Sequence, residues 1–82
     1  MPRRTVDFGP GQYYHLYNRG VNRSLIFRER DDFLLTLRKI QGYLPELDLT
    51  VIAYCLMPNH YHILIHQNGD QAAGLLPQRV FN

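Results

Sequence analysis

Two histidines separated by one residue, His60 and His62, are the residues of this sequence best suited to chemistry. Successive side chains of a β-strand point to opposite faces, so both imidazoles would lie on one face of a strand and Tyr61 on the other. Two adjacent imidazoles can bind a divalent metal ion, with waters or substrate phosphate oxygens completing the coordination. The pair alone does not establish a metal site, because such histidines often serve packing or lie on a surface.

Other residues are candidates for the surroundings of this pair. His15 belongs to a separate aromatic-rich segment and would line the same site if that segment paired with the histidine strand, although a histidine satisfied within the sheet is the simpler interpretation. His66 shares the face of His60 and His62, and we interpret it as a solvated strand end. Cys55 is the single cysteine. It therefore forms no internal disulfide, and its apolar neighbours predict a buried thiol in a reducing compartment.

The first half of the chain predicts a strand, a loop and a helix. Residues 12–17 are aromatic-rich and strand-like, and Asn18-Arg19-Gly20 predicts the turn that ends them. Residues 21–29 predict a loop. Apolar residues then recur at helical spacing from about Asp31 to Leu44, with acids in the first turn. Pro45 is the expected end of this helix.

The histidine pair falls in the second strand of a predicted hairpin. Residues 49–56 are β-branched and apolar, which predicts a buried strand. Met57-Pro58-Asn59 predicts a tight turn that Asn59 caps or braces, and the alternative for Asn59 is a role beside the histidines as a residue lining the site. Residues 60–66 alternate in the manner of a strand. The two histidines are therefore expected near the turn, at the start of the second strand.

Residues 67–70 predict a polar loop, and residues 71–82 begin as a helix in which Pro77 either occupies the first turn or breaks the segment. The order β-α-β-β-α predicts an α+β fold with an antiparallel sheet, the front of a ferredoxin-like β-α-β-β-α-β arrangement. The last strand is missing, so a free sheet edge is expected, which favours a homodimer. Residues 1–11 are expected to form an irregular arm and residues 12–82 one domain.

Composition and charge limit the possible functions. The longest apolar run, residues 51–57, is far shorter than the ~20 residues of a membrane span, so no membrane partner is expected and the cytoplasm is the expected location. Residues 1–40 hold eight of the nine basic residues against four acids. This charge allows contact with nucleic acid. Arg19 and Arg23, with Asn18, are candidates for contacting DNA phosphates, and surface arginines beside a turn are the alternative.

Two motifs resemble one protein family. The run Ala53-Tyr54-Cys55-Leu56-Met57-Pro58-Asn59-His60-Tyr61-His62-Ile63-Leu64 resembles the metal-binding hairpin of the REP-associated tyrosine transposases and their single-tyrosine insertion-sequence relatives. The run Tyr14-His15-Leu16-Tyr17-Asn18-Arg19-Gly20, followed by Asn22-Arg23 and Ile26-Phe27, is similar to that family's first strand and the loop after it. The resemblance covers residues 10–82, and the two motifs occur in the family's order, with one helix between them.

The resemblance implies that His60 and His62 form the family's HUH motif with Tyr61 and bind Mg²⁺ or Mn²⁺. Imidazole ligands suit Mn²⁺ better than Mg²⁺. The implied function is transposition: the domain binds single-stranded DNA beside a hairpin and, when complete, cleaves and rejoins it. The metal would polarise the scissile phosphate while a tyrosine hydroxyl attacks in line, giving a 5′-phosphotyrosine and a free 3′-OH.

The family's nucleophile lies on a helix after the HUH strand, but no tyrosine follows Tyr61 in this sequence. The resemblance therefore implies a nucleophile beyond Asn82 and an inactive chain in its absence. Conjugative relaxases place their tyrosine before the motif, which makes Tyr13, Tyr14 and Tyr17 alternatives. Sheet packing or stacking on bases explains these three residues more simply. A relaxase-like or replication-initiator-like nuclease and a non-catalytic DNA-binding remnant are the alternative functions.

Overall fold

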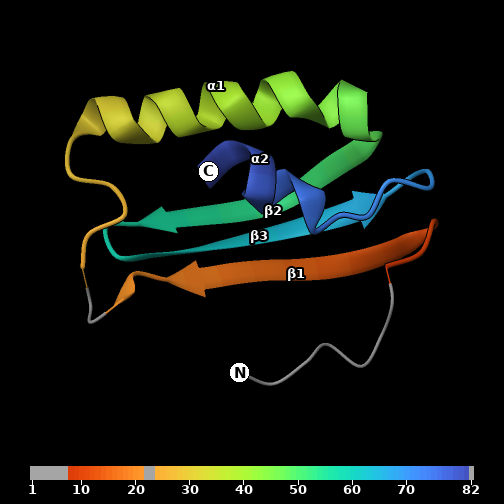
Figure 1. Ribbon diagram of the computed structural model, residues 1–82, viewed down its shortest axis with the longest axis horizontal. Helices are drawn as coiled ribbons and strands as arrows, with labels where there is room; N and C mark the ends of the chain where they lie inside the picture. The colour runs from red at the N-terminus through yellow and green to blue at the C-terminus, as the bar shows by residue number, and fades with distance from the viewer. Residues whose placement is uncertain (1–7, 22–23, 82) are drawn as a thin grey trace.

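The computed structural model describes residues 8–21 and 24–81. Three strands and two helices follow one another in the predicted order: β1 (Gln12–Arg19), α1 (Arg30–Leu47), β2 (Leu49–Met57), β3 (His60–Gln67) and α2 (Leu75–Phe81). β3 is the central strand and pairs antiparallel with β1 on one side and with β2 on the other. Both helices lie on the same side of the sheet (Figure 1). The fold is α+β, compatible with a partial ferredoxin-like arrangement, as the sequence predicts.

The core lies between the sheet and the two helices. In β3 the residues at alternate positions, Tyr61, Ile63 and Ile65, are almost completely buried, while His62 and Leu64 between them are exposed. The helices contribute apolar side chains from their sheet-facing sides, among them Ile40 and the completely buried Leu76. The face of the sheet turned toward the helices therefore packs in the core, and the opposite face is available for binding.

β1 and α1 both extend beyond their predicted ends. Asn18 and Arg19 were expected in a turn, but they continue β1 because they pair with Tyr61 and His60 of β3. Helix α1 includes Pro45 and ends at Leu47. A proline in the last turn of a helix removes only the bond to the carbonyl four residues earlier, and continuing the helix buries Leu47. Asp48, with a left-handed φ of 53°, then ends the helix.

The prediction that residues 49–56 form a buried strand is wrong in one respect. β2 is an edge strand, with Ile52 and Tyr54 about half exposed. Cys55, expected to be a buried thiol, is exposed. Its side chain points away from the helices, because the residue is paired with His62, on the face that no described helix covers. An apolar neighbourhood in sequence does not bury a side chain when only one face of its sheet is packed.

The connection between β3 and α2 is better ordered than the predicted polar loop. Gln67 belongs to the end of β3 and is completely buried. Its side-chain oxygen accepts a hydrogen bond from the Ala73 N–H at 2.8 Å, and its side-chain nitrogen donates to the Gly69 carbonyl at 3.0 Å. Pro77 occupies the first turn of α2, where a proline costs little, since N–H groups there have no partner within the helix.

Candidate metal and nucleic-acid site

The sheet face turned away from the helices carries the candidate site. We call it the histidine face, and it is formed by the outward residues of β1 and β3: Tyr13, His15, Tyr17, Arg19, His60, His62, Leu64 and His66. His60 and His62 lie on this face as strand alternation predicts, with ring centroids 5.4 Å apart. His62 is exposed and His60 is half-buried. Both imidazoles are accessible to a ligand approaching from solvent.

His15 is part of the same group. The antiparallel register of β1 and β3 places it diagonally across from His62. Its Nε2 atom lies 2.9 Å from Nδ1 of His62, and the two rings are stacked with centroids 5.0 Å apart. Two ring nitrogens at this distance share one proton, since one must donate and the other accept. His15 therefore orients the His62 ring, and the two side chains are coupled although they belong to different strands.

His60 is oriented by its neighbour in the hairpin turn. Nδ1 of His60 lies 2.8 Å from Oδ1 of Asn59. An amide oxygen can only accept a hydrogen bond, so Nδ1 of His60 carries the proton and Nε2 keeps its lone pair. The backbone carbonyl of Asn59 accepts a hydrogen bond from the Gly20 N–H at 2.8 Å. Asn59 thus braces the turn with its backbone, as predicted, and fixes the tautomer of His60 with its side chain.

Each of the two hydrogen bonds engages the Nδ1 atom of one histidine. When Nδ1 of His62 donates to His15, Nε2 of His62 also keeps its lone pair, like Nε2 of His60. No group of three or more His, Cys, Asp or Glu residues within 8–21 and 24–81 is arranged to hold a metal ion. A metal bound by the two Nε2 atoms would therefore keep several positions open for water or phosphate oxygens, as a catalytic metal requires.

The loop after β1 is hydrogen-bonded to the hairpin turn beside these histidines. The backbone N–H groups of Ile26 and Phe27 both donate to the Pro58 carbonyl, at 2.8 and 3.0 Å. Phe27 is buried and stacks on Phe33, with ring centroids 4.7 Å apart. The two sequence motifs, far apart along the chain, therefore meet in space. Two parts of the loop, Gly20 and residues 26–27, therefore donate backbone hydrogen bonds to the hairpin turn that contains Asn59.

Two of the three candidates for DNA contact, Arg19 and Asn18, lie within the described residues and point to opposite faces of the sheet. Arg19 ends β1 opposite His60 on the histidine face. Asn18 belongs to the helix side of β1, where its side chain is hydrogen-bonded to Tyr61 and its Oδ1 atom accepts the Arg19 N–H at 2.8 Å. Arg23 lies outside the described residues. Arg19 is thus the described candidate whose strand position faces the histidines.

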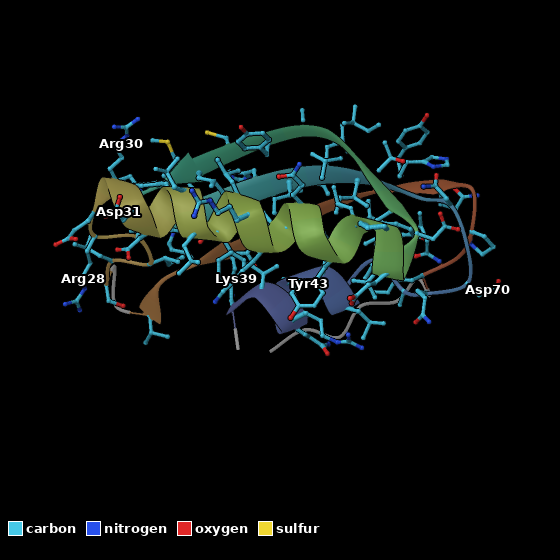
Figure 2. All side chains as sticks on the ribbon, turned by 90° about the horizontal axis from the view of Figure 1, so that it is seen from above. Arg28, Arg30, Asp31, Lys39, Tyr43 and Asp70 are labelled. Atoms are coloured by element: carbon cyan, nitrogen blue, oxygen red, sulfur yellow. The ribbon has the colours of Figure 1, made fainter. Side chains whose placement is uncertain are left out.

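Among the described residues, the basic side chains other than Arg19 lie outside the three strands. Figure 2 shows Arg28 and Arg30 near the start of α1 and Lys39 farther along this helix, in the layer on the other side of the sheet. The three strands contain one charged residue, Arg19, and no aspartate or glutamate. The histidine face therefore repels no anion, although it owes this to the absence of acids more than to a cluster of basic side chains.

The tyrosines divide between the two faces. Tyr61 is buried on the helix side and stacks on Phe81, with ring centroids 4.6 Å apart. Burial raises the pKa of its hydroxyl above the usual value of 10.0, and the hydrogen bond with Asn18 opposes this rise. Tyr14 is also buried, and its hydroxyl accepts the Gly9 N–H at 2.6 Å. Tyr13 and Tyr17 are exposed on the histidine face, so they are the tyrosines of this face that a ligand bound there can contact.

Two residues of β2 that border the histidine face were not predicted to lie beside it. Cys55 pairs with His62 and Met57 pairs with His60 across the hairpin. Counting outward from a two-residue turn at Pro58 and Asn59 gives this register, so the signal was present in the predicted hairpin. His66, expected to be a solvated strand end, is half-buried and hydrogen-bonded to Asn68.

Comparisons of the chain with protein-family models, with curated proteins and with solved structures find no match. None of the helices in the described part of the chain is long and apolar enough to cross a membrane. Function is therefore inferred from the residues of the histidine face and from the motifs that contain them.

Proposed function

We propose that this chain is a transposase domain of the single-tyrosine HUH type, which binds single-stranded DNA beside a hairpin through a divalent ion held by His60 and His62. One observation carries the proposal. The Nδ1 atoms of both histidines are engaged, by Asn59 and by His15, and both Nε2 atoms remain available on one sheet face. Metal-binding histidines are oriented in a similar way, by a hydrogen bond from the second ring nitrogen to an acceptor that is usually a carboxylate, a backbone carbonyl or water.

The chain's own residues have three tasks in this proposal. His60 and His62 would hold Mn²⁺ or Mg²⁺, which when bound supplies positive charge that polarises and orients the scissile phosphate. Asn59 keeps His60 in the tautomer that can coordinate, and His15 does the same for His62 when it accepts the shared proton. Arg19, opposite His60, is placed to contact a phosphate of the same strand. The absence of carboxylates from the three strands leaves the open metal positions to phosphate oxygens and water.

The nucleophile is not assigned to Tyr61, because its buried hydroxyl lies on the other side of the sheet from the histidines. In the proposed transposase a tyrosine from outside residues 1–82 attacks the phosphate, and the covalent phosphotyrosine conserves the bond energy for rejoining. A relaxase-like nuclease is the second candidate, favoured by Tyr17. This exposed tyrosine stacks beside His62, with ring centroids 6.1 Å apart. A DNA-binding domain without catalysis is the third.

Two further features belong to the proposal. The outer edge of β2, with Ile52 and Tyr54 exposed, is the proposed contact between two copies of the chain, and light scattering would report it as a doubled mass. The cytoplasm is the proposed location, since a single cysteine, here exposed, suits a reducing compartment.

The first test measures binding of a fluorescent single-stranded hairpin DNA to the chain with Mn²⁺ or with a chelator. We expect the chelator, His60→Ala and His62→Ala each to weaken binding by about tenfold or more, as loss of a metal ligand does. His66→Ala is the matched control for the effect of the chelator and should keep it, because His66 lies on the same face but outside the proposed ligand pair. Equal affinity under all these conditions would exclude the metal-dependent mode.

A denaturing gel with labelled DNA then separates the three candidate functions. A covalent adduct formed by this chain and lost in Tyr17→Phe would support the relaxase-like candidate. Metal-dependent binding without an adduct supports the transposase domain that lacks its nucleophile, and an adduct should then appear when a longer protein with a tyrosine-bearing helix added after Asn82 replaces the chain. Binding without an adduct in either protein favours the non-catalytic domain.

A further inference from the structure

The histidine face continues beyond the two proposed metal ligands as a row of rings along β1. Tyr13, His15 and Tyr17 point outward from alternate positions. Tyr17 contacts His15 and His62, with ring centroids 5.1 and 6.1 Å apart, and Tyr13 meets the edge of His66 at 4.7 Å. These neighbours hold the tyrosine rings in place without covering them, since Tyr13 is 64% exposed and Tyr17 is 68% exposed.

Large aromatic rings held in place and exposed on a sheet are suited to stacking on planar ligands. Nucleic-acid bases are such ligands, and they offer their faces freely only in a single strand, because in a duplex each base is already stacked on its neighbours. The strands beneath the rings contain Arg19 and no carboxylate, so the strands themselves place no negative charge under this track. Both the shape and the charge of the face therefore suit a single nucleic-acid strand.

We propose that Tyr17 and Tyr13 are two base-stacking positions, and that the DNA strand runs along β1 with its bases on these rings. This inference rests on the proposed function and adds to it the part of the substrate that each tyrosine binds. Tyr17 adjoins His62, so it takes the base next to the phosphate bound at the histidines. Tyr13 lies four residues away, about 13 Å along the strand, and takes a base farther from the cleavage site.

This arrangement makes binding tolerant of sequence at the two stacked bases. Every base has an aromatic face, so stacking discriminates weakly between them. Selection of single-stranded over double-stranded DNA follows from the same contacts. The target sequence would then be read elsewhere, and the tyrosine row would hold the strand in the correct alignment with the metal-binding histidines.

The test measures the affinity of the chain for a single-stranded oligonucleotide by fluorescence anisotropy, with Mn²⁺ uptake measured in parallel by calorimetry. Tyr17→Ala and Tyr13→Ala are each expected to weaken DNA binding about 5- to 100-fold, the range of one lost base–aromatic stack. Tyr17→Phe keeps the ring and should bind nearly as the original chain does. Leu35→Ala is the matched control, since Leu35 is 53% exposed but belongs to α1, on the other side of the sheet.

The outcomes for the stacking proposal and for the metal site are distinguishable. Weaker DNA binding in Tyr17→Ala with unchanged Mn²⁺ uptake supports the stacking proposal. Normal DNA binding in both tyrosine variants overturns it and leaves the proposed metal site intact, whereas loss of Mn²⁺ dependence in the original chain counts against the proposed function itself. Tighter binding of RNA of the same sequence would overturn the choice of DNA as the occupant.

An oligonucleotide series with one base removed at each position in turn gives the alignment. Removing the base that stacks on Tyr17 should weaken binding to the original chain and should have no further effect in Tyr17→Ala, because the same contact is absent in both. The assignment of Tyr17 to one base would be contradicted if no single removed base weakened binding. It would also be contradicted if the effect of removing each base were the same in the original chain and in Tyr17→Ala.

Discussion

His15 and His62 share a hydrogen bond of 2.9 Å between Nε2 and Nδ1, although 47 residues separate them in the sequence. The bond exists because β1 and β3 are neighbours in the sheet, so a residue of the first strand reaches a residue of the hairpin. It is a direct side-chain contact between the two sequence motifs, one in β1 and the other in the hairpin. Nε2 of His62 is left for a ligand when His62 donates the shared proton to His15, whereas the Asn59 oxygen can only accept and so decides the tautomer of His60.

Replacing His15 tests this coupling. We expect His15→Ala to lower the Mn²⁺ affinity of the chain by about 10- to 100-fold, the usual effect of removing a residue that orients a metal ligand. His15 is exposed, so the fold should be kept, which circular dichroism would verify. Calorimetry measures the affinity, and His15→Gln, whose side-chain oxygen can still accept a hydrogen bond, should recover part of it. An unchanged affinity in His15→Ala would remove His15 from the site.

Asn59 gives the corresponding prediction for His60. Asn59→Ala removes the acceptor of the His60 Nδ1 proton but keeps the backbone carbonyl that accepts from Gly20. We therefore expect an intact hairpin with about tenfold or greater loss of Mn²⁺ affinity. Asn59→Asp retains an acceptor and should bind the metal better than Asn59→Ala. Nitrogen chemical shifts of the His60 ring report the tautomer directly, and a ring protonated on Nδ1 in Asn59→Ala as in the original chain would contradict the assigned role.

The hairpin and its histidines could be predicted from the sequence because the signals are local. Alternation along residues 60–66 gives the common face of His60 and His62, and Pro58-Asn59 marks the turn. The place of His15 could only be stated conditionally, since it depends on which strand lies beside β3. That pairing involves residues about 50 positions apart and leaves no trace in either segment alone.

The incorrect predictions from the sequence also arise from contacts between residues far apart in the chain. Asn18 and Arg19 have the composition of a turn but form strand, since β3 supplies pairing partners for both. Cys55 lies in an apolar run but is exposed, because the helices cover only one face of the sheet. Gln67 was predicted to lie in a polar loop, yet its side-chain amide is buried and hydrogen-bonded to the Ala73 N–H and the Gly69 carbonyl. In each case tertiary contacts override the local preference.

The buried amide of Gln67 is predicted to stabilise the connection between β3 and α2. Gln67→Leu fills a similar volume but leaves the Ala73 N–H and the Gly69 carbonyl without their side-chain partner. Each such group costs about 1–3 kcal/mol when it stays buried, so we expect a loss of this order in the free energy of unfolding. Urea denaturation measures the loss. Gln78→Leu, on the exposed side of α2, is the control and should change stability by less than about 0.5 kcal/mol.

Packing of α2 against the sheet should be essential to a domain of this size. Leu76 is completely buried, and Leu76→Ala is expected to cost about 2–5 kcal/mol in the free energy of unfolding, since the side chain leaves a cavity behind. Leu35→Ala removes the same atoms from a position that is 53% exposed and should cost far less. Similar unfolding midpoints for the two variants in urea would show that α2 contributes little to the core.

The start of α1 predicts a pH dependence of stability. Hydrogen bonds from the Arg28 and Glu29 N–H groups, at 2.7 and 3.0 Å, hold the pKa of the Asp32 carboxyl below its usual value of 3.8. The folded state therefore favours the charged form. This stabilisation is present above pH 3.8 and is lost as the pH falls through the lower pKa of the folded state.

Asp32→Asn removes the charge, so this variant should melt at a lower temperature than the original chain near neutral pH. The difference should shrink as the pH falls below 3.8, where Asp32 of the original chain becomes protonated. Asp31→Asn is the matched control, because it removes the neighbouring charge and leaves the two hydrogen bonds to Asp32 in place. Thermal melts of the three proteins across the acidic range measure the effect. A melting difference between the original chain and Asp32→Asn that stays constant down to strongly acidic pH would show that the Asp32 carboxylate does not stabilise the start of α1.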